Sequence, residues 1–299
     1  MEEKTHKKYL ELTSDIVFKE FMMSEKTKEF KADLLNAITK IPVKELLKAE
    51  FSSNELVGNS KDDKVFKTDI LVQVKNKNIL ILEMNKYFYD GIMAKTHQYA
   101  SRILSSELEK GENYIDIKEV IEISFNDFKV MEHNRLINEL AITNISTGKR
   151  VSEMNWRGFQ IDLKTIEDKC YNKEEEKIVY LFKIFSNDEK VVESLEGKNK
   201  NMDKALNELE RISNDKEIIG LYDVEAVERK VYNSKMKTAE RIGMENGMKK
   251  GLEKGLKKGL EQGKLEMIKN MILNKVDDTI IMNSAKINEE KLKQIKSEM

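Results

Sequence analysis

The chain has 299 residues, of which 36% are charged and 39% are hydrophobic. Because 53 basic residues balance 54 acidic ones, the formal net charge of -1 excludes any inference of nucleic-acid binding from overall charge. The single cysteine, Cys170, excludes an internal disulfide, and its spacing from the three histidines does not fit a zinc site. No apolar run is long enough to span a membrane, and the charged start does not resemble a secretory signal. We therefore expect a cytoplasmic protein with no membrane partner.

The N-terminal region is predicted to be helical and then to form a β-hairpin. Apolar residues at helical spacing predict a broken pair of helices over residues 13–38, and Pro42, the only proline, closes that segment. After an irregular stretch, alternating apolar residues predict a strand over 65–74. The polar turn "KNKN" then leads into a second strand over 79–85.

The following segments predict a sheet with a crossover helix. Apolar residues on one face predict a helix over 90–110, which Gly111 ends. A buried strand over 117–125 comes next, and the order strand, long helix, strand is typical of a crossover unit. A short strand over 157–163 completes a modest sheet, so the sequence predicts an α/β fold.

The sequence changes character after about residue 167. The segments "EEEKIVYLFKIF" and "DKALNELERIS" are amphipathic and predict a small helical subdomain beside the sheet. From Tyr222 onward the pattern predicts one long charged helix. The last residues form two short predicted helices that start near Asp277 and Asn288.

The long charged helix carries a glycine at every fourth position. The six glycines are Gly243, Gly247, Gly251, Gly255, Gly259 and Gly263. On a helix this spacing makes a slowly winding groove beside the apolar residues that follow most of the glycines. Each glycine costs up to about 1 kcal/mol relative to alanine, so a partner helix would compensate, and self-association through this helix is one interpretation. The other is a frayed, flexible charged linker, and the sequence leaves both open.

Three polar residues interrupt the apolar pattern of the predicted hairpin. Asp69 lies on the first strand, and Glu83 and Asn85 lie on the second. A three-residue loop at 75–77 allows the register in which Asp69 faces Glu83, which places both acids and Asn85 on one face. The remaining positions are apolar on both faces, so we expect the sheet to be covered on both sides.

Two facing carboxylates repel each other unless a proton or a cation lies between them. A hard divalent ion such as Mg²⁺ takes oxygen ligands and commonly uses one or two carboxylates with water and substrate phosphate. Held by Asp69 and Glu83, such an ion would support phosphodiester hydrolysis, and Asn85 could hydrogen-bond the attacking water or a phosphate oxygen. The alternative is an edge hairpin whose acids reach solvent, and the pattern alone does not decide between the two.

An ordered set of motifs resembles one known family. The matching segments are "SDIVFKEFM", "LLNAI", "TDILVQV", "ILILEMNKYFY", "LEKGENYIDIKEVIEISF" and the glycine-rich tail. Together they resemble the Rpn family of recombination-promoting nucleases and transposases, which has a PD-(D/E)XK nuclease core. The resemblance covers most of the chain. It implies a restriction-endonuclease-like fold with a mixed sheet flanked by helices, and Mg²⁺-dependent DNA cleavage linked to recombination or mobile DNA.

The resemblance also implies roles for individual residues. Asp69 matches the first metal-binding acid of the family and Glu83 the second. The third position is usually Lys or Gln and is Asn85 here, so the alternative function is a catalytically impaired relative that binds DNA or itself. Lys86 is adjacent to it, but strand alternation directs Lys86 to the other face. On the following helix four residues are candidates for DNA contact, with core packing and surface solvation as equal alternatives: His97, Gln98, Tyr99 and Arg102.

Three regions follow from this interpretation. We expect a nuclease-like domain over 1–165, a helical subdomain over 166–228, and a charged glycine-rich helix with a helical tail over 229–299.

Overall fold

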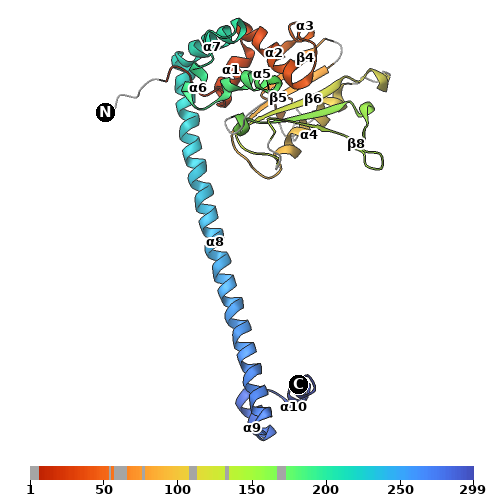
Figure 1. Ribbon diagram of the computed structural model, residues 1–299, viewed down its shortest axis with the longest axis vertical. Helices are drawn as coiled ribbons and strands as arrows, with labels where there is room; N and C mark the ends of the chain where they lie inside the picture. Colours follow the sequence, from red (N-terminus) through yellow and green to blue (C-terminus); the bar gives the residue numbers. More distant parts are fainter. Residues whose placement is uncertain are drawn as a thin grey trace, which may run out of the picture. The chain divides into compact units, whose positions relative to one another are not determined.

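The computed structural model divides the chain into two compact units, Met1–Ala226 and Val227–Met299. The structure describes residues 7–53, 55–56, 66–75, 78–107, 113–131, 135–166 and 173–299. The first unit holds a six-stranded mixed sheet with helices on both faces, and the second is helical (Figure 1). The fold is therefore α/β with a helical C-terminal region, as predicted. The predicted helix end at Gly111 and the single Cys170 lie outside the described residues.

The predicted pair of N-terminal helices is confirmed. Helix α1 (Asp15–Met23) and helix α2 (Lys28–Thr39) are joined through a short 3-10 turn, Glu25–Thr27. Helix α3 (Val43–Leu46) begins directly after Pro42.

The sheet has the strand order β1-β4-β5-β6-β10-β7. Its strands are β1 (Glu50–Ser52), β4 (Ile70–Val74), β5 (Asn78–Asn85), β6 (Glu119–Asn126), β7 (Ile137–Ala141) and β10 (Trp156–Asp162). The pairs β5–β6 and β6–β10 are parallel, and the other three are antiparallel. Helix α4 (Ile92–Ser106) connects β5 to β6 and is the predicted crossover helix.

The central hairpin has the predicted register. Leu71 of β4 lies opposite Ile81 of β5, and Gln73 lies opposite Ile79. Strand β4 begins at Ile70, later than the sequence pattern predicts. The reason is local, because the backbone amide of Asp69 donates to the side chain of Glu83 in β5 rather than to a backbone carbonyl of that strand.

Several short strands were not predicted. They are the edge strands β1 and β7 of the sheet, strand β2 (Glu55–Leu56), and a separate ladder of β8 (Thr143–Asn144) with β9 (Lys149–Arg150). Strand β3 (Phe66–Lys67), which pairs with β2, lies within the segment predicted as a strand over 65–74. Strand β7 is only half buried, so it lacks the alternation of apolar and polar residues that marks a strand over a core.

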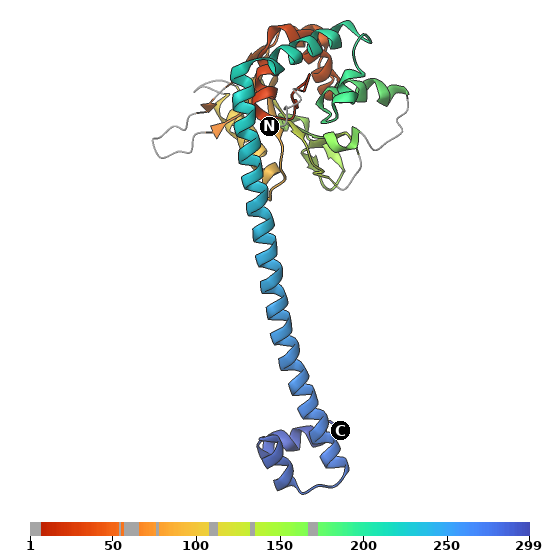
Figure 2. The ribbon, with the colours of Figure 1, turned by 90° about the vertical axis from the view of Figure 1, so that its left-hand side faces the viewer.

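The two faces of the sheet are covered by different helices. One face packs against α1, α2, α5 (Lys173–Phe182) and α7 (Lys200–Ser213), and it forms the main hydrophobic core. The other face packs against α4 and forms a smaller apolar cluster. Figure 1 shows the first group of helices on one side of the sheet and α4 on the other, and Figure 2 gives the view turned by 90°. Both faces are covered, as expected from the hairpin pattern.

The second unit contains helix α8 (Lys216–Leu273) from Val227 onward and two short helices. Helix α9 (Asp278–Ala285) follows Asp277, and helix α10 (Glu289–Ser297) follows Asn288; both side chains accept a hydrogen bond from a first-turn amide. Both helices begin where the sequence predicts. Their apolar residues pack with the end of α8 in a small core. In the part of the chain that the structure describes, no helix combines the length and the apolar character needed to span a membrane.

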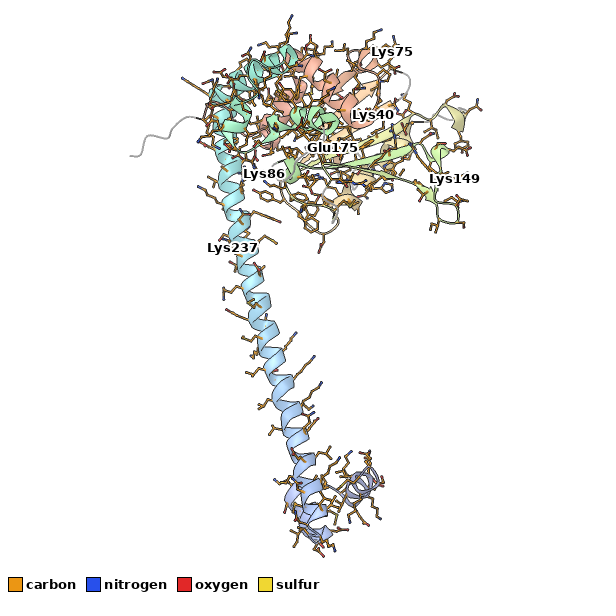
Figure 3. All side chains as sticks on the ribbon, in the orientation of Figure 1. Lys40, Lys75, Lys86, Lys149, Glu175 and Lys237 are labelled. Atoms are coloured by element: carbon orange, nitrogen blue, oxygen red, sulfur yellow. The ribbon has the colours of Figure 1, made fainter. Side chains whose placement is uncertain are left out.

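The glycine-rich segment is helical and lies entirely within α8. The position of an added Cβ at each of the six glycines meets open space. The apolar residues beside them are between 65% and 77% exposed: Met244, Met248, Leu252, Leu256 and Leu260. Figure 3 shows the side chains along α8, on which Lys237 is labelled, pointing outward from the helix.

Candidate active site

The two acids of the hairpin lie side by side. The backbone amide of Asp69 donates to Glu83 Oε1 at 3.2 Å, and the amide of Met84 donates to Asp69 Oδ2 at 2.8 Å. Glu83 is 2% exposed, and its main-chain neighbours in β5 are buried on both sides. The structure therefore brings Asp69 and Glu83 together at the start of β4 and the end of β5, as the predicted register requires.

Two lysines hold the remaining oxygens of this acid pair. Lys19 Nζ of α1 lies 3.0 Å from Asp69 Oδ1 and 2.8 Å from Asp15 Oδ2. Lys95 Nζ of α4 lies 3.2 Å from Glu83 Oε2. Each of the four carboxylate oxygens thus has a nitrogen partner, one backbone amide and one lysine for each acid. Sequence reasoning did not single out either lysine.

Burial disfavours the negative charge of both acids. It raises the pKa of Glu83 to about 7; the nearby charge of Asp69 adds to this effect, and Lys95 opposes it. The pKa of Asp69 is raised as well, first by burial and then by Asp15, against the opposing effect of Lys19. A positive charge beside the pair would therefore favour the ionised form of both carboxylates.

The lysines respond in the opposite direction. Burial lowers the pKa of Lys19, but the charges of Asp69 and Asp15 outweigh burial and raise it overall. Lys95 likewise has a raised pKa, because burial is outweighed mainly by Glu83. Both side chains are therefore ammonium ions at neutral pH.

Asn85 is turned toward the neighbouring strands. Its Nδ2 donates to Asn126 Oδ1 at 3.1 Å, and Asn126 Nδ2 donates to Gln160 Oε1 at 3.1 Å. Asn85 is 7% exposed, and the other two are still more buried. This chain of amides crosses β5, β6 and β10, so the Asn85 amide nitrogen is directed along the sheet.

The amide chain belongs to a larger polar region under α4. In the sheet register Glu83 lies beside Ser124, which lies beside Gln160, and one step further Asn85, Asn126 and Asp162 form a second row. All six are buried. The Ser124 hydroxyl is buried and makes no hydrogen bond within the part of the chain that the structure describes. Polar side chains therefore gather where the three parallel strands end.

A comparison with protein-family models identifies the family of the chain. The model of the PD-(D/E)XK nuclease family transposases matches residues 12–239. The chain belongs to this family. No curated protein and no solved structure showed detectable similarity to the chain. The resemblance found in the sequence motifs is confirmed, and the family supports a nuclease-like or transposase-like role.

The donor set of this family member suits a hard divalent ion. Asp69 and Glu83 offer adjacent carboxylate oxygens, which are the ligands that Mg²⁺ and Mn²⁺ take together with water and phosphate. Among the described residues no group of three or more His, Cys, Asp or Glu side chains could hold a metal. The present partners of the pair are two lysines, whose flexible side chains can move aside.

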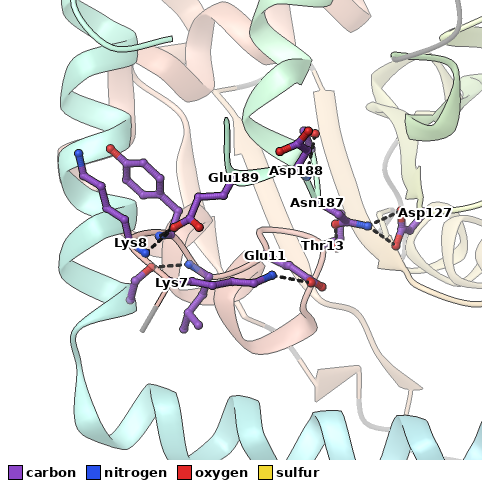
Figure 4. Close-up of polar contacts among 12 residues, drawn as sticks. Lys7, Lys8, Glu11, Thr13, Asp127, Asn187, Asp188 and Glu189 are labelled. Carbon is purple, nitrogen blue, oxygen red and sulfur yellow. Dashed lines mark hydrogen bonds and ion pairs between the residues drawn. The ribbon is translucent and has the colours of Figure 1, made fainter. Parts of the chain in front are cut away.

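Lys86 follows the third motif position but serves another contact. Its Nζ lies 2.9 Å from Glu11 Oε2 and 3.3 Å from Thr13 Oγ1, on the side of the sheet away from α4. Thr13 in turn donates to Asn187, whose amide contacts Asp127 at the end of β6 (Figure 4). Lys86 therefore ties β5 to the N-terminal segment, in line with the expected strand alternation.

The four candidates for DNA contact on α4 differ in how far they are exposed to solvent. Tyr99 is buried in the cluster beneath α4, which makes it a core residue. His97 and Gln98 are exposed, and the His97 ring lies edge-on to Trp156 with 4.8 Å between ring centroids. Arg102 is half-buried.

Glu122 is a second buried acid on the α4 face that the sequence did not indicate. It is 2% exposed, and Trp156 Nε1 donates to its Oε2 at 3.3 Å, while Thr96 of α4 donates a further hydrogen bond. Burial raises the pKa of Glu122 to about 7, against the opposing effect of these two hydrogen bonds. The acid therefore links β6 to α4 and to β10.

Proposed function

We propose that the chain is a divalent-metal-dependent DNA endonuclease that acts in DNA recombination or on mobile elements. The observation that carries the proposal is the adjacent, buried pair Asp69 and Glu83 in a chain that belongs to the PD-(D/E)XK nuclease family transposases. The physiological ion in this proposal is Mg²⁺. A cytoplasmic location accords with the single cysteine of the sequence.

In this proposal the residues of the hairpin have distinct tasks. The ion would lower the pKa of a water molecule and stabilise negative charge on the phosphate. Asp69 and Glu83 hold it, which also removes the repulsion between two buried carboxylates. Asn85 is one strand position beyond Glu83 on the same face, and its amide group is available to orient a water or a phosphate oxygen if it gives up Asn126.

One observation favours the alternative of a catalytically impaired relative that binds DNA or itself. The third motif position is Asn85, which carries no charge and whose amide nitrogen donates to Asn126. Cleavage and binding separate the two possibilities, because the alternative retains DNA binding without cleavage.

The test is a plasmid-cleavage assay on the full chain. Supercoiled plasmid is incubated with Mg²⁺, Mn²⁺ or EDTA and with the wild type, Asp69→Asn or Glu83→Gln. We expect cleavage that needs the metal and falls by about 10³-fold or more in both variants, since each removes a charged ligand. Glu122→Gln is the matched control, because Glu122 is equally buried on the same face but is not part of the acid pair. Cleavage that persists in both acid variants would remove this site assignment, and DNA binding without any cleavage by the wild type would favour the alternative.

We further propose that the glycine-rich part of α8 associates with a second copy of the chain. Its apolar ridge is largely exposed, and the glycines beside it leave room for another helix. The residue after each ridge position alternates acid and base along the helix: Glu245, Lys249, Glu253, Lys257 and Glu261. Such a pattern pairs opposite charges when a copy lies alongside with a suitable offset.

Sedimentation of the full chain tests this association. We expect a mass above that of the monomer, and Leu252→Lys with Leu256→Lys should return the chain to a monomer because lysines would be buried between helices. Lys250→Gln, at an exposed position beside the ridge, is the control. A monomeric wild type at all concentrations would contradict the proposal.

A further inference from the structure

Lys95 lies in the candidate site but is not one of the motif residues. It lies in the first turn of α4, and its Nζ is 3.2 Å from Glu83 Oε2 and 5.3 Å from the centre of the Tyr99 ring. Its side chain remains 37% exposed, although the carboxylate that it contacts is almost fully buried. The ammonium group therefore contacts a buried acid from a side chain that solvent still reaches.

The neighbouring polar residues are committed to other contacts. Asn85 has no charge and donates its amide to Asn126. Lys86 is held by Glu11 and Thr13 on the opposite side of the sheet. Lys19 is shared between Asp69 and Asp15. Lys95 has one carboxylate partner and also contacts Tyr99, so only one ion pair has to break before its ammonium group can turn to another anion.

We propose that Lys95 supplies the positive charge missing from the third motif position and binds the phosphate that is cleaved. This inference rests on the proposed function. In the reaction the oxygen of water forms a bond to phosphorus and one phosphorus–oxygen ester bond breaks. One water proton ends on the leaving oxygen, and the other belongs to the new phosphate monoester or passes to solvent. Lys95 keeps its own proton throughout and stabilises the negative charge that builds up on a non-bridging oxygen.

The contact with Glu83 gives the proposal a consequence for metal binding. In the present structure Lys95 neutralises Glu83 and thus occupies the place of a cation. Lys95 must release Glu83 Oε2 before that oxygen can serve as a ligand, and its charge then remains near any ion in the site. Removing the ammonium group therefore removes both a competitor and a repelling charge, so divalent ions should bind more tightly without it.

The experiment combines calorimetric Mn²⁺ titration with plasmid cleavage on the full chain. For Lys95→Met we expect Mn²⁺ affinity to rise about fivefold or more, while cleavage falls about 10²-fold, the loss typical for one charge-stabilising donor. Lys95→Arg should retain at least about a tenth of the wild-type rate, because it keeps the charge. Lys118→Met is the matched control, since Lys118 is 39% exposed and its Nζ lies 3.1 Å from Glu107. Its Mn²⁺ affinity and cleavage should equal those of the wild type.

If Lys95 had a purely structural role, its removal would not raise the affinity for Mn²⁺ and lower the rate of DNA cleavage at the same time. Unchanged or weaker Mn²⁺ binding by Lys95→Met, or cleavage at the wild-type rate, would overturn the proposal. A wild type that binds Mn²⁺ and does not cleave DNA would instead contradict the proposed function. Thermal unfolding monitors integrity, and Lys95→Gln replaces Lys95→Met in both assays if the methionine variant does not fold.

Discussion

The two faces of the six-stranded sheet differ in what their buried side chains do. Toward α1, α2, α5 and α7 the strands present mainly apolar residues, and Phe125 packs there against Phe18 and Phe185. Toward α4 the same strands are apolar at one end and polar at the other, with Glu83, Asn85 and the amide chain where the parallel strands finish. One face therefore stabilises the fold, and the other buries groups that favour charge or hydrogen-bonding partners. Consecutive residues of one strand therefore lie on opposite faces and have different roles.

The buried acids of the polar face lower the stability of the folded protein. Burying a carboxylate disfavours its charge, which is why the pKa values of Glu83 and Glu122 are raised to about 7. The charge of Glu83 is partly compensated by Lys95, whereas Glu122 has hydrogen bonds from Trp156 and Thr96 but no ion pair with the residues that the structure describes. Neutralising the buried acid Glu122 on the polar face should therefore raise stability at high pH, whereas truncating a side chain on the apolar face should lower it.

The largest expected effect lies on the apolar face. Phe125→Ala should lower the free energy of unfolding by about 3–5 kcal/mol, because it removes a fully buried ring and leaves a cavity beside Phe18 and Phe185. Urea unfolding followed by circular dichroism measures the change. Ile123→Val, on the same face of the same strand, should lose only about 1 kcal/mol. Equal losses in the two variants would show that the ring cluster is not a centre of stability.

The next effect lies on the polar face and has the opposite sign. The folded pKa of Glu122 is about 7 against a reference of 4.5, so the folded state keeps a proton that the unfolded state loses between these values. Stability therefore falls as the pH rises from about 4.5 to about 7 and stays lowered above that range. Glu122→Gln has no charge to bury and should be more stable than the wild type at pH 8.5 by up to about 3 kcal/mol.

The pH dependence of this stability difference tests whether the burial of charge causes it. The advantage of Glu122→Gln should shrink to a small fraction of this value near pH 4.5, where the wild-type carboxyl is protonated in the folded state and about half protonated in the unfolded state. Urea unfolding of both proteins at the two pH values gives the difference at each. A stability difference that is the same at pH 4.5 and pH 8.5 would rule out the burial of charge as its source.

A smaller effect is expected from the amide chain. Asn126→Ala leaves Asn85 and Gln160 without the partner that joins them, and an unsatisfied buried amide costs about 1–3 kcal/mol. Differential scanning calorimetry measures the loss. Asn138→Ala, at a partly exposed position of β7, serves as the control. No loss in Asn126→Ala would mean that water replaces the missing amide and that the chain does not hold the strands together.

Local patterns in the sequence predicted the central hairpin and the tail. The register that places Asp69 beside Glu83 could be derived because both strands alternate and the turn has an accepted length. The starts of α9 and α10 could be read from Asp277 and Asn288, whose side chains cap the first turns. These features depend on residues close together in the sequence.

The remaining part of the site depends on distant segments. Asn126 and Gln160 join Asn85 through the register of parallel strands, which crossover connections set and no turn reveals. Lys19 and Lys95 reach the acids with long side chains from helices on opposite faces, so spacing along the chain does not identify them. The edge strand β7 is too exposed to show a clear pattern.

The most direct test is calorimetric titration of the full chain with Mn²⁺ at pH 8, comparing the wild type with Asp69→Asn and Glu83→Gln. If the two acids hold one divalent ion together, the wild type binds it and each variant loses at least about tenfold in affinity, while Glu122→Gln binds as the wild type does. Unchanged Mn²⁺ affinity in both Asp69→Asn and Glu83→Gln would contradict the metal site.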